Sequence, residues 1–228
     1  MIKAVIFDLD DTLISERDYI NSGFKYIAQL LSEKSSKSTD DLYSMLQNLF
    51  ISSPDKVFNR LLDCLNIVYT EDDIMELVHA YRNHNPKIHL LEDVVPCIDW
   101  LRRNGFKLGI ITDGYFESQY KKLQAINAYE LFDEIIITDE LGREYWKPHP
   151  KSFEIMKQRL NVEYGEMIYV GDNPTKDFYI RKWYPIITVR CYRNGIYNHS
   201  DYKDGIKEVH SVTSLDQLRN ICDKYGRK

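Results

Sequence analysis

The hydrophobic positions of the chain follow two different periods along its length. A first apolar run, Val5–Phe7, is short, continuous and rich in β-branched and aromatic residues, which predicts a buried strand. Apolar residues then recur at helical spacing through residues 14–85, where no strand pattern is found. The amphipathic stretches of this part predict a compact bundle of about four helices, over residues 18–31, 40–50, 56–67 and 70–83.

Beyond residue 91, short apolar strands alternate with helical patterns. Strands are expected at residues 107–112, 134–138, 167–172 and 185–190. Helices are expected at residues 92–105, 116–126, 150–160, 174–183 and 213–225. This alternation predicts right-handed crossovers and a parallel sheet that is covered by helices on both faces.

The expected fold is therefore α/β, with a doubly wound parallel sheet in a Rossmann-like core and an inserted α-helical cap domain. Residues 1–13 and 91–228 would form the core, and residues 14–90 would form the helical insertion.

Acidic residues follow the first strand at once. The stretch VIFDLDDTL, residues 5–13, places Asp8, Asp10 and Asp11 within four positions. Acids are poor strand formers, so the strand ends here. At about 4 Å and an effective dielectric near 20, each pair of carboxylates repels by roughly 4 kcal/mol, so a cation or a proton is expected among them. Taken alone, the stretch is equally consistent with an acidic surface turn.

Polar residues also end the later strands. Thr112 closes the second strand in IITDG, Lys147 follows the third in WKPHP, and Asp172 ends the fourth in GDNPTKD. Ligands of doubly wound sheets bind at the carboxyl ends of the strands, so we expect these residues to lie close to Asp8. Each position alone is common, whereas the four in this order, each after its own strand, are a specific signal.

With these motifs the chain resembles the haloacid-dehalogenase-like hydrolase superfamily. The family pattern is Asp-x-Asp-x-Thr, a Thr or Ser that ends the second strand, a Lys, and a Gly-Asp pair followed five residues later by another Asp. Here these motifs are Asp8–Thr12, Thr112, Lys147 and Gly171–Asp177. The resemblance covers the whole chain, and the helical insertion is similar to the cap that one subclass carries after its first motif.

The resemblance implies a phosphatase that works through an aspartyl-phosphate intermediate. It implies that Asp8 is the nucleophile and Asp10 the general acid and base, with Thr112 and Lys147 completing the catalytic set. Substrate binding is expected from Thr112 and Lys147 together with Asp113 and Gly114.

A magnesium ion is the cofactor that the resemblance implies. Four carboxylates around a phosphate dianion would be untenable without cations, and an oxygen-rich site that faces phosphate suits Mg²⁺. By resemblance, Asp8 and Asp172 offer side-chain oxygens and Asp10 its backbone carbonyl. Asp177 would complete the metal site as an outer acid that holds Lys147 or a bound water.

The expected substrate is a small phosphorylated metabolite, either a sugar phosphate or a nucleotide, and the helical insertion is expected to select it. Asp10 argues against dehalogenases and phosphonatases, which lack a second Asp in the first motif. A phosphomutase on the same scaffold remains open, as does a phospho-accepting signalling module without turnover. The insertion and the proximity of Asp10 to Asp8 favour turnover over signalling.

Composition limits the partners and the cell compartment that we expect for the protein. The 228 residues carry a formal charge of −5, which gives no basic surplus for holding nucleic acid. No apolar run approaches 18 residues and the sequence enters its first strand at once, so neither a membrane span nor a signal peptide is expected. Four scattered cysteines indicate free thiols and a cytoplasmic location. The oligomeric state is left open.

Overall fold

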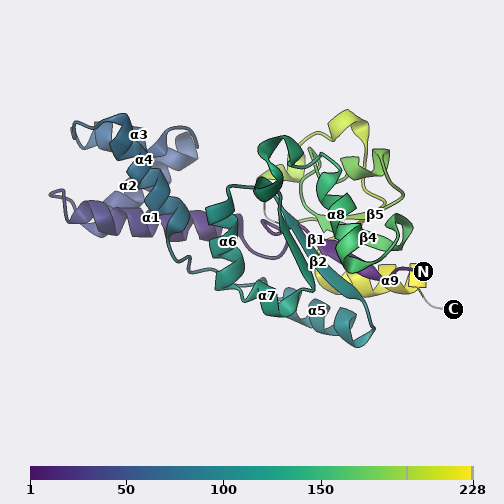
Figure 1. Cartoon of the computed structure of the whole chain (residues 1–228). Coiled ribbons are helices and arrows are strands. Elements are labelled where there is room, and N and C mark those ends of the chain that lie inside the picture. The colour runs from purple at the N-terminus through teal and green to yellow at the C-terminus, as the bar shows by residue number, and fades with distance from the viewer. Residues whose placement is uncertain (194, 227–228) are drawn as a thin grey trace. The chain divides into compact units, whose positions relative to one another are not determined.

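A computed structural model describes residues 1–193 and 195–226 and divides the chain into two compact units (Figure 1). The sheet unit consists of Met1–Glu16 and His89–Lys228, and the helical unit consists of Arg17–Ile88. Residues 14–16 and 89–90, which we expected in the helical insertion, belong to the sheet unit. Ile14 forms β-bridges with Asp10 and Leu90, and these bridges join the two chain segments at the base of the insertion.

The sheet unit is built on a parallel sheet of six strands in the order β3-β2-β1-β4-β5-β6. Five of these strands lie where apolar runs predicted them. The sixth was missed because it has only three residues, HSV, of which Val212 alone is buried. The strands are β1 (Ala4–Phe7), β2 (Lys107–Thr112), β3 (Glu134–Ile137), β4 (Met167–Gly171), β5 (Ile187–Cys191) and β6 (His210–Val212).

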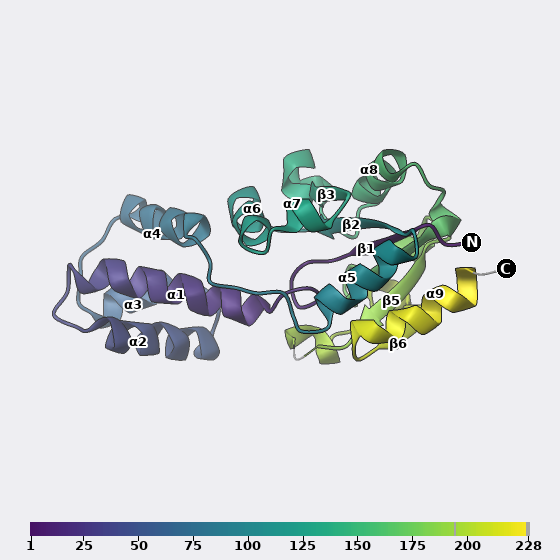
Figure 2. The ribbon, with the colours of Figure 1, turned by 90° about the horizontal axis from the view of Figure 1, so that it is seen from below.

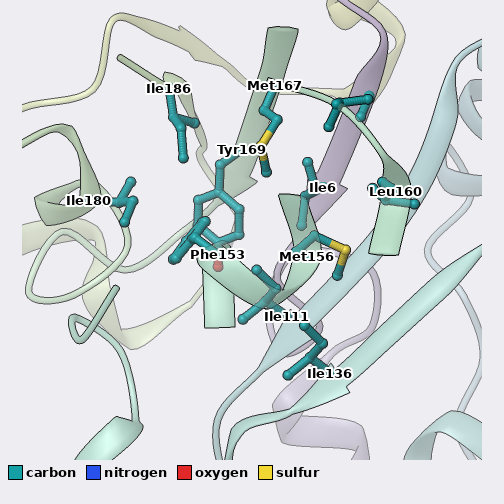
Figure 3. Packing of buried hydrophobic residues seen from close by; sticks show 12 residues of the cluster. Ile6, Ile111, Ile136, Phe153, Met156, Leu160, Met167, Tyr169, Ile180 and Ile186 are labelled. Carbon is teal, nitrogen blue, oxygen red and sulfur yellow. The ribbon is translucent and has the colours of Figure 1, made fainter. Parts of the chain in front are cut away.

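Helices cover both faces of this sheet, as expected for a doubly wound fold (Figures 1 and 2). Helix α8 packs on one face, and α5 and α9 pack together on the other. In Figure 3, Ile6, Ile111 and Ile136 of neighbouring strands meet Phe153 and Met156 of α8. The helices of the unit are α5 (Val94–Arg103), α6 (Phe116–Ala125), α7 (Ala128–Leu131), α8 (Lys151–Leu160) and α9 (Leu218–Gly226).

The expected α-helix over residues 174–183 is replaced by a turn and a short 3-10 helix, Tyr179–Lys182. The Asp177 amide donates to the Asn173 carbonyl at 3.0 Å, and the Asp177 carboxylate accepts the Asn173 N–H at 3.0 Å. This reciprocal pair closes the turn at the end of β4.

The strand order creates a switch point at β1. The chain passes from β1 outward to β2 and β3, and then returns to β4 on the other side of β1. Asp8 extends the end of β1 and donates its N–H to the Val170 carbonyl of β4 at 2.8 Å. The edge where Asp8 and Asp172 follow adjacent strands is therefore the position at which such sheets bind ligands.

The helical unit forms its own core from four helices, as the sequence period predicted. The first of them, α1, begins at Glu16 in the sheet unit, and Asp11 caps it by accepting the Glu16 N–H at 3.0 Å. Thr70 and Asp73 form a reciprocal capping box at the start of α4. No described helix of either unit combines the length and the apolar character needed to cross a bilayer. The four helices are α1 (Glu16–Ser32), α2 (Thr39–Ser52), α3 (Val57–Cys64) and α4 (Glu71–Asn83).

The packing of the core of the helical unit can be tested with two side chains of equal size on α2, Leu46 and Ile51. Leu46 is fully buried in the cluster around Phe24 and Phe58, whereas Ile51 on the same helix is 70% exposed. Leu46→Ala should lower the free energy of unfolding by about 2–5 kcal/mol because it leaves a cavity. Ile51→Ala, the control, should change it by less than about 0.5 kcal/mol. Urea denaturation followed by circular dichroism measures both, and equal effects would contradict this packing.

Candidate active site

A buried lysine connects the ends of three strands. The Lys147 ammonium lies 2.7 Å from Asp8 Oδ1 and 2.9 Å from Asp177 Oδ1, and its side chain is fully inaccessible to solvent. It also donates to the Tyr169 hydroxyl at 2.8 Å. Burial alone would lower the pKa of Lys147, but the adjacent carboxylates of Asp177 and Asp8 raise it well above its usual value. Lys147 is therefore a fixed positive charge.

Both carboxylate oxygens of Asp177 accept hydrogen bonds from other groups of the protein. Its Oδ1 accepts from Lys147 and from the Tyr169 hydroxyl at 3.2 Å, while Oδ2 accepts the Asn173 N–H. A side chain at Gly171 would collide with this carboxylate, so only glycine lets Asp177 lie under the end of β4. The same geometry favours Asp177 as the outer acid that the sequence predicted.

Three carboxylates gather at this edge of the sheet. One oxygen each from Asp8, Asp172 and Asp177 lies within 4.8 Å of the others, and all three residues are buried. Burial, together with the neighbouring carboxylates of Asp177 and Asp8, raises the pKa of Asp172 to about 9. Burial also raises the pKa of Asp8, to about 6, although Lys147 opposes the shift.

This cluster fits a metal ion by its donor chemistry. In the described part of the chain, no hydrogen bond or ion pair reaches the Asp172 carboxylate, although Lys147 neutralises its neighbours. A site of carboxylate oxygens with one uncompensated acid is suited to a hard divalent cation. Asp8 and Asp172 could therefore hold a metal, with Asp177 beside them as an outer acid whose two oxygens already accept hydrogen bonds.

The fourth predicted metal residue, Asp10, has its side chain elsewhere. Its carboxylate accepts from Lys122 Nζ at 2.7 Å and from Gln119 Nε2 at 2.8 Å, both on α6. The cluster of metal-binding carboxylates does not include it. Asp10 could therefore reach a metal only through its backbone carbonyl, which is the role that the resemblance implied.

Thr112 and Asp10 are linked through the side-chain amide of Gln119. The Thr112 hydroxyl is 2.6 Å from Gln119 Nε2, and Thr112 is almost fully buried at the end of β2. Gly114, two residues later, has a positive φ of 139°, a conformation that disfavours other residues. The turn after β2 therefore places Thr112 and Gly114 at the same edge as Asp8.

Asp113, which we expected to bind substrate, has a different environment. Its Oδ1 accepts from the Thr138 hydroxyl at 2.7 Å and from the Lys147 N–H at 3.1 Å. Its Oδ2 pairs with Lys176 Nζ at 3.0 Å. Burial would raise the pKa of Asp113, but Lys147 and Lys176 hold it below its usual value. Both carboxylate oxygens of Asp113 already have partners within the protein. This favours a supporting role for Asp113 over the substrate contact that we expected.

Sequence reasoning missed four residues of this constellation, namely Gln119, Lys122, Tyr169 and Lys176. A signal existed for two of them. Gln119 and Lys122 are polar residues three positions apart on an amphipathic helix, and both fall on its buried face. Tyr169 was indistinguishable from a core residue of β4, and Lys176 from a solvated lysine in a turn.

Comparison with known proteins places this site in context. Residues 5–180 match the family model of haloacid dehalogenase-like hydrolases. The chain is 33% identical to glyceraldehyde 3-phosphate phosphatase of Methanopyrus kandleri over 98% of its length and 97% of that protein. The enzyme of the same name from Pyrococcus furiosus is 31% identical over 98% of this chain and 94% of its own.

Solved structures give the same grouping. A HAD phosphatase from Thermococcus onnurineus superposes with a TM-score of 0.62 at 28% identity, covering 96% of this chain and 97% of that one. A 2-haloacid dehalogenase from Pseudomonas syringae has a TM-score of 0.66 at 20% identity, covering 99% of this chain and 100% of that one. The second likeness concerns the fold alone, because the fold is common to phosphatases and dehalogenases.

Replacing Asp172 by Asn should change how the stability of the metal-free protein depends on pH. With the Asp172 pKa raised from 3.8 to about 9, the folded protein keeps a proton that the unfolded chain loses between these values. Stability of the metal-free wild type therefore falls as pH rises through this window. Asp172→Asn removes this contribution and should melt several degrees higher than the wild type at about pH 8.

Differential scanning calorimetry at about pH 5 and pH 8, with and without MgCl₂, measures this effect. Magnesium should raise the melting temperature of the wild type and have a much smaller effect on Asp172→Asn. The exposed Asp99→Asn on α5 is the control and should behave as the wild type. A wild-type response in Asp172→Asn would contradict the assignment of this carboxylate.

Proposed function

The chain belongs to the haloacid dehalogenase-like hydrolase family, and we infer that it is a phosphatase acting on a small phosphorylated metabolite. We propose that the reaction proceeds through an aspartyl-phosphate on Asp8. The observation that carries this proposal is the buried ion pair between Asp8 and Lys147, with Asp172 beside it at the end of β4. An isolated surface acid would have neither of these partners.

In the first half-reaction, an Asp8 carboxylate oxygen attacks phosphorus and forms the acyl-phosphate bond while the bond to the substrate oxygen breaks. Lys147 is bound to Asp8 Oδ1, so the cation orients the nucleophile and lies close to the developing charge on the phosphoryl oxygens. We propose that the Thr112 hydroxyl and the backbone N–H groups up to Gly114 donate to those oxygens. In the second half-reaction, water attacks phosphorus and releases phosphate with Asp8 restored.

Asp10 is proposed as the general acid and base. It would deliver a proton to the departing alkoxide and later remove one from the attacking water. Its side chain differs from that of Asp8 in exposure, because 19% of it is accessible whereas the Asp8 side chain is 5% accessible. The more exposed acid is the one that can exchange its proton with solvent between the two half-reactions.

Mg²⁺ is the proposed metal. Asp8 and Asp172 would provide side-chain oxygens and Asp10 its carbonyl, while Asp177 holds Lys147 and the Asn173 backbone. When bound, such an ion neutralises charge between the carboxylates and a phosphate. The cluster of three buried carboxylates supports the proposal, because only a cation or a proton can offset charge that is gathered so closely.

Glyceraldehyde 3-phosphate is the first substrate that we propose to test. Relatives with this name match the chain over nearly its full length. Pyrophosphatase PpaX of Bacillus cereus, at 28% identity, matches only 75% of the chain, so inorganic pyrophosphate is a second choice. We further propose that the helical unit acts as the cap that selects the substrate, and that the protein works in the cytoplasm, where its four free thiols would persist.

Substitution of the two acids should separate their roles. Asp8→Asn keeps the shape but removes the nucleophile, so turnover should fall to background. Asp10→Asn should lower turnover of glyceraldehyde 3-phosphate by about 10²–10⁴-fold, because proton transfer is lost in both half-reactions. With 4-nitrophenyl phosphate, whose leaving group needs little protonation, the loss should arise mainly in hydrolysis of the phosphoenzyme.

Rapid quench with a ³²P-labelled ester follows the phosphoenzyme directly. A hydroxylamine-sensitive phosphoenzyme in Asp8→Asn would show that another residue is the nucleophile. A stable phosphoenzyme in the wild type, without multiple turnover, would support a signalling module. Transfer of the phosphoryl group to a second sugar position, activated by a bisphosphorylated sugar, would identify a phosphomutase.

Removal of the metal should abolish hydrolysis. After treatment with EDTA, Mg²⁺ should restore activity and Ca²⁺ should restore little, because Ca²⁺ prefers more ligands at longer distances. Release of phosphate from 4-nitrophenyl phosphate measures this, with metal content checked by mass spectrometry. Full activity in protein free of divalent metal would contradict the proposed cofactor.

A further inference from the structure

The side chain of Asp10 is held by two residues of α6. Lys122 Nζ lies 2.7 Å from Asp10 Oδ1, and Gln119 Nε2 lies 2.8 Å from Oδ2, so each carboxylate oxygen has its own donor. The three residues come from segments more than 100 positions apart in the sequence. This contact is therefore made by the tertiary fold.

Lys122 is unusual because its whole side chain is buried with the charge at its tip. Its side chain is 5% accessible, whereas Lys121 and Glu117 of the same helix lie nearer the surface. A buried ammonium loses its hydration and persists in a fold only with an anion nearby. Asp10 supplies that anion, and a neutral side chain of similar length would pack there without this cost.

Gln119 adds a second restraint that links two motifs. Its Nε2 lies within hydrogen-bonding distance of Asp10 Oδ2, the Thr112 hydroxyl and the Asp113 carbonyl. Its Oε1 is buried without a hydrogen-bond partner among the described residues. A flipped amide would place that oxygen against the Asp10 carboxylate and the carbonyl, so the acceptors fix the orientation. An unsatisfied buried oxygen lowers stability, and the arrangement persists in spite of it.

The turn after β2 leaves space for this amide. A Cβ at Gly114 would lie 3.1 Å from Gln119 Cδ, in addition to the strain of its positive φ. The glycine of the second motif thus permits the Gln119 side chain to reach Asp10. Hydrogen bonds therefore connect α6 with the turn after β2 and with the turn after β1.

From these contacts we propose that Lys122 is a positioning residue for Asp10, and that it acts together with Gln119. The inference rests on the proposed role of Asp10 as general acid and base. Lys122 fixes the Asp10 carboxylate in one place, so the proton donor does not have to be ordered during the reaction. Loss of Lys122 should therefore affect the part of catalysis that depends on Asp10 and leave substrate binding nearly intact.

Two substrates with different leaving groups test this. In Lys122→Met, kcat for glyceraldehyde 3-phosphate and for phenyl phosphate should fall about 10–100-fold with KM changed by less than about threefold. For 4-nitrophenyl phosphate in single-turnover phosphorylation, the loss should be less than about threefold. Lys122→Arg should recover most of the activity. Lys157→Met, which breaks a surface ion pair with Glu163, is the control and should match the wild type.

A double-mutant cycle identifies the route of the effect. In an Asp10→Asn background, Lys122→Met should cause no further loss, because the group that it positions is already absent. Additive losses, or equal losses with both leaving groups, would overturn the positioning role. If Lys122→Met does not fold by circular dichroism, Gln119→Met must give the same dependence on leaving group and the same lack of additivity, and its failure to do so would also overturn it.

The same data separate this inference from the proposed function. If Asp10→Asn shows the expected dependence on leaving group while Lys122→Met does not, the positioning role alone is overturned. If Asp10→Asn shows no dependence on leaving group, the role proposed for Asp10 fails, and the positioning role fails with it.

Discussion

The buried ion pair of Lys147 with Asp8 and Asp177 is the constraint on which the rest of the site depends. A charge in a dry interior is tolerated only when its partners are fixed. Tyr169 and the Asn173 backbone fix these partners. The Tyr169 hydroxyl accepts a hydrogen bond from Lys147, and the Asn173 N–H donates to Asp177. Position 171 must therefore be glycine, because a Cβ there would collide with the Asp177 carboxylate. This geometry accounts for the glycine that ends β4.

The same ion pair leaves room in the charge balance for a further cation, which the cluster of carboxylates could hold. Lys147 neutralises part of the charge on Asp8 and Asp177, and it leaves Asp172 close to both without a partner of its own. Burial, and after it the repulsion from Asp177 and Asp8, raises the pKa of Asp172 to about 9. In our proposal a bound metal ion would take the place of the proton on Asp172.

Much of this could be predicted from the sequence, because strand ends are local features. The apolar runs located five strands, and the doubly wound rule placed Asp8, Thr112, Lys147 and Asp172 at one edge. The environment of Asp113 could not be predicted, because its partners Thr138 and Lys176 lie in segments that follow two other strands, β3 and β4. The expected helix at 174–183 was wrong because a turn closed by Asn173 and Asp177 comes first, and only Tyr179–Lys182 form a short 3-10 helix.

Two acids separated only by Leu9 are tied to two different lysines, and this separation gives them different chemistry. Asp8 pairs with Lys147 from the segment after β3, while Asp10 pairs with Lys122 from α6 after β2. One acid is almost inaccessible and the other is partly exposed. When environments differ in this way, adjacent titratable groups can take separate roles in one reaction. The division that we propose between nucleophile and proton carrier therefore follows which lysine each carboxylate contacts, and those lysines lie far from residues 5–13 in the sequence.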